Sequence, residues 1–141
     1  MFVKTVSYKT YDGVPVTEDF YFNFTQAEIM EMQYGEYGGF SNRVQKMIDT
    51  HDQPALIKLI KEFVLDAYGV KSPDGKRFQK NEELRKAFEE CPAYSEIFME
   101  LALDDVKAAE FVKGVVPENM KEDVAKATAE AKAKLPAGAA N

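Results

Sequence analysis

The chain is poor in the side chains that most often carry chemistry. Its 141 residues include one cysteine, Cys91, one histidine, His51, and no tryptophan. A single cysteine cannot close a disulfide within the chain, and one cysteine with one histidine cannot build a Cys/His zinc site within one subunit. No segment approaches the ~20 consecutive apolar residues that a membrane-spanning helix needs. We therefore expect no metal, no cofactor and no membrane partner.

The net charge also indicates which class of molecule the chain binds. The formal net charge of −6 works against attraction to phosphate backbones, so we expect protein partners and no nucleic acid. Hydrophobic residues make up 45% of the chain and charged residues 30%, which is typical of one globular domain with one core. The N-terminal segment resembles a strand and not a signal peptide, so we expect a cytosolic protein.

The first 24 residues predict a β-hairpin with its turn at Tyr11-Asp12-Gly13. In the second strand one face is apolar and aromatic: Val14, Val16, Phe20, Phe22 and Phe24. An isolated hairpin is marginal in water, so helices of the same chain or another chain must cover this face.

The rest of the chain predicts helices. Thr25 and Glu28 form a capping-box pattern at the start of a helix that runs to about Tyr34 and is broken by GEYGG. Further helices are expected over about 40–50, from Pro54 to Gly69 as the central core helix, from Asn81, after Pro92, and from Asp104 to Gly114. Residues 69–80 are expected to be a polar connection with a tight Ser-Pro-Asp-Gly turn.

The predicted fold is thus α+β and mainly helical, with an N-terminal β-hairpin followed by a compact bundle of about five to six helices. Residues 1–117 form a single globular domain, in which 1–24 are the hairpin and 25–117 the bundle. Residues 118–141 are rich in Ala, Lys and Glu and have little to bury, so we expect a peripheral helix and a disordered tail there.

Nothing in the chain predicts catalysis. His51 falls in a turn between helices, and Cys91 at a helix start is expected to be a small buried boundary residue. Acidic pairs such as Glu82-Glu83 fall at helix starts or on exposed faces, and no glycine-rich phosphate-binding motif is present. We expect a binding protein and no enzyme.

Two groups of residues are candidates for protein binding. The first is the basic cluster Lys71, Lys76, Arg77 and Lys80 around Phe78, which fits a small nucleic-acid patch, a contact to an acidic protein subunit, or a solvated turn with Phe78 in the core. The second is aromatic, and its members form a protein interface if they are partly exposed: Phe20, Phe22, Tyr34, Tyr37 and Phe40.

Three segments of residues 1–117 together resemble the tail assembly chaperones of siphophages: YDGVPVTEDFYFNFTQAEIMEM, AYGVKSPDGKRFQKNEELRKAFEECPAYSEIFMEL and DDVKAAEFVKGVVP. The resemblance implies a chaperone that binds the tape measure protein, keeps it soluble and helps the tail tube protein polymerise around it. It also implies self-association, action in the host cytoplasm and absence from the mature virion. The alternative is a small acidic phage protein that inhibits a host enzyme by protein–protein binding.

Overall fold

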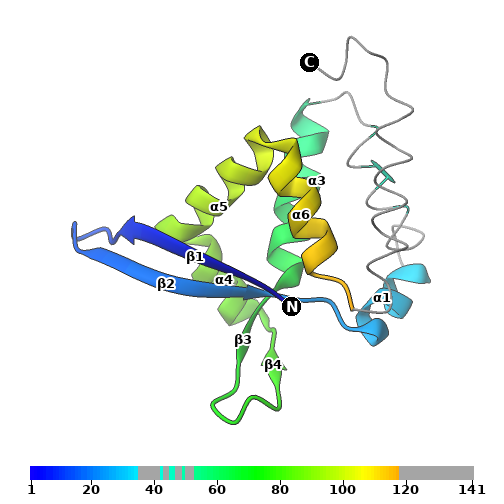
Figure 1. Ribbon diagram of the computed structural model, residues 1–141, viewed down its shortest axis with the longest axis horizontal. Coiled ribbons are helices and arrows are strands. Elements are labelled where there is room, and N and C mark those ends of the chain that lie inside the picture. Colours follow the sequence, from blue (N-terminus) through cyan, green and yellow to red (C-terminus); the bar gives the residue numbers. More distant parts are fainter. Residues whose placement is uncertain (35–41, 43–44, 47–48, 50–52, 118–141) are drawn as a thin grey trace.

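The computed structural model describes residues 1–34, 42, 45, 46, 49 and 53–117. The expected helix over about 40–50 and the C-terminal segment 118–141 fall wholly or mostly outside these residues. The described part contains a four-stranded sheet of order β1-β2-β3-β4 and five helices, two of which precede β3 (Figure 1). This confirms the predicted α+β fold.

The N-terminal hairpin joins β1 (Phe2–Lys9) to β2 (Pro15–Phe22) in a continuous antiparallel register from Phe2↔Phe22 to Lys9↔Pro15. The turn lies where the sequence predicts it. Gly13 has a φ of 82°, a conformation that glycine adopts without steric cost, and its N–H donates to the Thr10 carbonyl at 2.8 Å. The hairpin forms a long arm at the edge of the sheet (Figure 1).

The predicted polar connection over residues 69–80 is a second hairpin, with strands β3 (Tyr68–Lys71) and β4 (Phe78–Gln79). The tight turn is present: Gly75 has a φ of 73°, and the Ser72 N–H donates to the Arg77 carbonyl at 2.8 Å. The core helix α3 (Gln53–Ala67) consequently ends before Gly69, because Tyr68 and Gly69 pair with β2.

The local signals for helix starts are confirmed. At α1 (Gln26–Gln33), the Glu28 N–H donates to Thr25 Oγ1 at 3.1 Å and the Thr25 N–H donates to Glu28 Oε1 at 2.9 Å, which completes the capping box. Asn81 caps α4 (Glu82–Glu89) and Asp104 caps α6 (Asp105–Gly114) through side-chain oxygens. Between them, α5 (Pro92–Leu103) begins at its proline.

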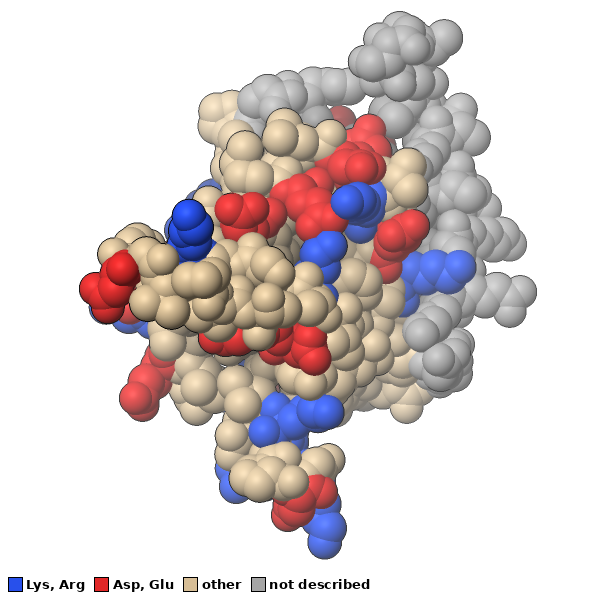
Figure 2. Space-filling view, turned by 60° about the vertical axis from the view of Figure 1, so that its left-hand side comes forward, with Lys and Arg blue, Asp and Glu red and all other residues tan. Residues whose placement is uncertain are grey.

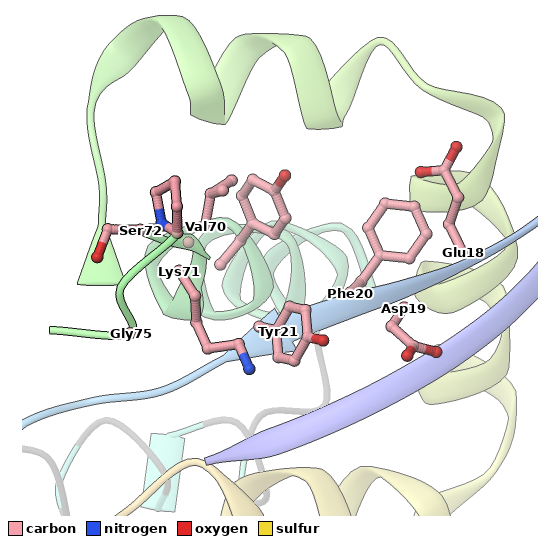
Figure 3. A pocket seen from close by; sticks show the side chains of 11 residues that line it. Glu18, Asp19, Phe20, Tyr21, Val70, Lys71, Ser72 and Gly75 are labelled. Carbon is pink, nitrogen blue, oxygen red and sulfur yellow. The ribbon is translucent and has the colours of Figure 1, made fainter. Parts of the chain in front are cut away.

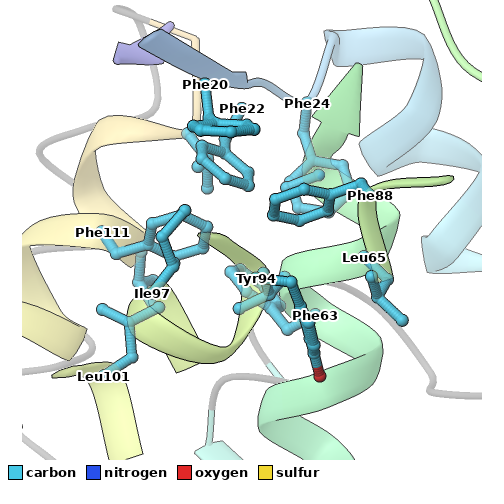
Figure 4. Packing of buried hydrophobic residues seen from close by; sticks show 14 of the residues in the cluster. Phe20, Phe22, Phe24, Phe63, Leu65, Phe88, Tyr94, Ile97, Leu101 and Phe111 are labelled. Carbon is cyan, nitrogen blue, oxygen red and sulfur yellow. The ribbon is translucent and has the colours of Figure 1, made fainter. Parts of the chain in front are cut away.

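The aromatic face of β2 is covered by helices of the same chain. Phe22 is fully buried, and its ring contacts those of Phe2, Tyr68, Phe88 and Phe111, with centroids 5.1–6.4 Å apart. Figure 4 shows Phe20 and Phe22 of β2 converging with side chains of several helices, among them Phe63, Phe88, Ile97 and Phe111. Val14 was expected on this buried face but is 54% exposed, because it lies in the turn at the end of the arm.

Candidate protein-binding surface

A notch opens where β3 leaves β2. The two strands share only two pairs, Tyr21↔Gly69 and Phe22↔Tyr68, after which β3 turns toward β4 while β2 stays with β1 as far as Pro15. A pocket of ≈ 420 Å³ lies between the diverging strands, lined by residues 18–21 of β2 and by residues 68–73 and 75. We call this pocket and its lining the strand notch; Figure 3 shows it with Phe20 and Tyr21 on one side and Val70 and Lys71 on the other.

The strand notch combines aromatic walls with charges of both signs. Lys71 Nζ lies 4.5 Å from the centroid of the Tyr21 ring, a cation–π distance. On β2, Asp19 accepts a hydrogen bond from the Thr5 hydroxyl at 2.6 Å, and Glu18 accepts one from the Tyr8 hydroxyl at 2.8 Å. Both carboxylates therefore have fixed positions at the rim.

Two tyrosines close to Glu18, Tyr8 and Tyr68, hold their protons more firmly than a free tyrosine. Side-chain contacts with Cys91 and then with Glu18 raise the pKa of Tyr8 well above its ordinary value. Burial raises the pKa of Tyr68, whose ring stacks on Phe88 with a centroid separation of 4.1 Å. These phenols act as neutral hydrogen-bonding or packing groups over the physiological pH range.

The basic cluster of the sequence separates into structural and exposed members. Lys80 Nζ donates to the Asn23 carbonyl at 2.7 Å and to Glu28 Oε2 at 2.6 Å, so it joins the end of β4 to the start of α1. Phe78 is half-buried against Gly69. Lys71, Lys76 and Arg77 are exposed, the last two at the turn of the β3–β4 hairpin. That hairpin projects from the body of the molecule (Figures 1 and 2).

The aromatic candidates also separate into buried and exposed residues. Phe20 and Phe22 are 6% and 0% exposed, so both pack the core, and only a small part of Phe20 reaches the pocket of the strand notch. Tyr34, at the end of α1, is 88% exposed and is available to a partner. Tyr37 and Phe40 lie outside the described residues. The structure thus leaves one described aromatic candidate, Tyr34, on the surface.

An exposed apolar corner between α5 and α6 was not predicted from the sequence. Met99 and Leu103 lie one turn apart on α5 and are 48% and 78% exposed, and Val106 at the start of α6 is 61% exposed. Their helical spacing resembles that of core positions. Only the packing of the helices shows that these side chains face outward.

The reactive side chains form no site in the described part of the chain. Cys91 is half-buried at the N-cap of α5 and its side chain makes no capping hydrogen bond, while His51 lies outside the described residues. No group of three or more His, Cys, Asp or Glu side chains within the described ranges is arranged to hold a metal ion. None of the described helices is both long and apolar enough to span a membrane.

The chain matches a model of a known protein family. A family model described as phage tail assembly chaperone matches residues 1–140. The match extends through the Ala/Lys-rich end, which lies beyond the segments that carry the sequence resemblance. No curated protein and no solved structure matches the chain.

Proposed function

Because the chain belongs to the phage tail assembly chaperone family, we propose that it binds the tape measure protein of its phage. Binding keeps that long protein soluble and promotes assembly of the tail tube around it. The chaperone self-associates, acts in the cytoplasm of the host cell and is absent from the mature virion. The family match over residues 1–140 is the observation that carries this proposal.

The surface of the protein supports a chaperone that holds a partner without changing it chemically. Exposed apolar side chains occur on four of the described helices: Met30 and Tyr34 at α1, Ile57 on α3, Met99 and Leu103 on α5, and Val106 on α6. Such side chains offer contact area to the apolar face of a client helix. Interspersed carboxylates and ammonium groups, visible over the face in Figure 2, favour a soluble complex.

Co-expression with the tape measure protein tests the proposal. We expect the chaperone to move the tape measure protein from the pellet to the soluble fraction and to co-purify with it. The substitution Leu103→Lys on the apolar corner should weaken this effect, whereas Lys113→Glu at an exposed polar position on α6 should not. A tape measure protein that stays insoluble with the wild-type chaperone contradicts the proposal. Mass spectrometry of purified virions checks that the chaperone is absent from them.

The alternative of an acidic inhibitor that mimics DNA has less support. Such a mimic needs carboxylates spaced like phosphates on one face. Here several carboxylates pair with lysines, as in Lys4–Glu100 at 2.7 Å and Lys61–Glu89 at 2.8 Å. Acidic and basic groups are mixed over the face in Figure 2. Capture of a host nuclease or polymerase in place of a tail protein would reverse this preference.

A further inference from the structure

In the first part of β2, the edge that faces away from β1 carries main-chain N–H and C=O groups. These groups pair with no strand that the structure describes. Successive residues of an antiparallel strand direct their N–H and C=O groups alternately to the two sides. The Thr10 N–H donates to the Val14 carbonyl at 2.9 Å, so even-numbered residues of β2 bond to β1. On the other side Tyr21 pairs with Gly69, and the Asn23 N–H donates to the Ala67 carbonyl at 2.9 Å.

The next two odd-numbered residues, Thr17 and Asp19, follow the same alternation. Their N–H and C=O groups point away from β1, toward the side that β3 occupies only as far as Gly69. No backbone hydrogen bond joins them to another residue that the structure describes. Both residues are exposed. An unpaired edge of this kind is a template for one more extended strand.

The pocket beside this edge has room for side chains of such a strand. Its volume of ≈ 420 Å³ lies directly between residues 18–21 and the β3–β4 hairpin. Phe20, Tyr68 and Val70 line it on the side that faces the core. An extended segment paired with Asp19 would direct its neighbouring side chains to this side, because successive side chains of a strand alternate between its two faces.

We propose that the strand notch binds one extended segment of the tape measure protein, which adds to the edge of β2 by main-chain hydrogen bonds at Thr17 and Asp19. This inference rests on the proposed function and adds a second contact surface, which binds an extended segment of the client in addition to the client helix at the exposed apolar side chains. One apolar side chain of the segment enters the pocket against Phe20 and Val70.

The carboxylates at the rim of the strand notch indicate which charged residues the bound segment carries. Glu18 and Asp19 place carboxylates on opposite faces of β2, each held by a hydroxyl of β1, from Tyr8 and Thr5 respectively. A client residue paired with Asp19 lies beside that carboxylate, and the next residue lies beside Glu18. The bound segment therefore carries a lysine or arginine next to the apolar residue.

The substitution Thr17→Pro tests whether the client pairs with the open edge of β2. Proline removes the Thr17 N–H and places its ring where the client main chain would lie, but leaves the hydrogen bonds between β1 and β2 intact because that N–H faces the notch. The matched control is Ser7→Pro. Each substitution removes the same 2.9 Å hydrogen bond between the Ser7 and Thr17 hydroxyls, but Ser7 directs its N–H to the opposite edge of the hairpin.

In co-expression with the tape measure protein, we expect Thr17→Pro to lower the amount of soluble complex about tenfold or more and Ser7→Pro to leave it close to the wild-type level. If the wild type, Thr17→Pro and Ser7→Pro all give the same amount of soluble complex, the strand notch is not the binding site, but the proposed function still stands. If the wild-type protein forms no soluble complex with the tape measure protein, both the strand notch and the proposed function are wrong. Loss of self-association with Thr17→Pro and unchanged client binding assigns the edge to a second copy, which also overturns the inference.

Amide hydrogen exchange on the wild-type protein gives a test that needs no variant to fold. Synthetic overlapping peptides that span the tape measure protein serve as probes. A bound peptide should slow exchange at the Thr17 and Asp19 amides and leave the Thr5 and Ser7 amides unchanged, and it should contain adjacent apolar and basic residues. Protection at neither Thr17 nor Asp19 by any peptide that binds contradicts strand addition.

Discussion

The ring of Phe78 lies over Gly69 so closely that a Cβ atom at position 69 would come within 2.5 Å of Phe78 Cε2. Gly69 belongs to β3 and Phe78 to β4, and Gly69 also pairs with Tyr21 of β2. The absence of a side chain at Gly69 therefore lets the second hairpin close onto the sheet. This contact holds one wall of the strand notch in place.

We predict that Gly69→Ala destabilises the protein by about 1–3 kcal/mol, because the added methyl group overpacks this contact. Gly69 is not among the described glycines with positive φ, so the cost is steric and not a backbone effect. Urea unfolding measures the change. The same substitution in a Phe78→Ala background should cost much less; an equal cost in both backgrounds would show that the Phe78 contact is not the cause.

We predict that Lys80→Met lowers the free energy of unfolding by about 1 kcal/mol, because it leaves the Glu28 carboxylate and the Asn23 carbonyl without their ammonium donor. The pair is partly exposed, at 23% for Lys80 and 31% for Glu28, which limits the effect. Lys76→Met, at the exposed turn of the same hairpin, should change the stability little. Thermal unfolding of the two variants compares them directly, and equal losses would contradict a structural role specific to Lys80.

We predict that Tyr94 makes the protein less stable as the pH rises from about 10 to about 12. Burial, with a smaller effect of the Glu89 charge, raises the pKa of Tyr94 to about 12, whereas an unfolded tyrosine titrates near ~10. In that window the unfolded chain loses a proton that the folded chain keeps, so the free energy of unfolding falls with pH.

The variant Tyr94→Phe provides the control for this alkaline effect. It should lose less thermal stability than the wild type between pH 9 and pH 11, since it has no proton to release at this position. Other tyrosines with raised pKa values, such as Tyr68, keep part of the pH dependence in both proteins. Parallel stability curves for wild type and variant would contradict the assignment to Tyr94.

We predict that Glu100 contributes to stability above about pH 4 and that this contribution is lost as the pH falls. Hydrogen bonds from Lys107 and then Lys4 lower the pKa of Glu100, at 2.6 Å and 2.7 Å, and join α5 to α6 and β1. The folded chain thus releases this proton at a lower pH than the unfolded chain. Glu100→Gln should flatten the acid limb of the stability curve, and Glu96→Gln, exposed on the same helix, should leave it unchanged.

Much of the local structure could be predicted because its causes are local. The capping box at Thr25 and Glu28, the Asn81 and Asp104 caps, and the Gly13 turn each depend on groups within a few residues of one another. Alternation in β2 likewise predicted that Phe20, Phe22 and Phe24 share a buried face, which the helices cover.

The candidate site was predicted less well than the fold. An aromatic or basic residue on a surface and one in a core have the same letter in the sequence, so the exposure of Tyr34 and the anchoring of Lys80 by Glu28 could not be read from it. The short strands β3 and β4 lack the length that makes a periodic pattern recognisable. In addition, β3 pairs with β2, a strand far away in the chain.

By itself the sequence determined how few reactive side chains the protein has, the class of fold and the places where helices and turns begin. These properties depend on composition and on neighbouring residues. Tertiary structure alone decided where β3 leaves β2 and which side chains remain accessible. The pair Tyr21↔Gly69 joins residues far apart in the chain, and beyond it β3 turns toward β4 while β2 stays with β1. The strand notch is the space between these two directions.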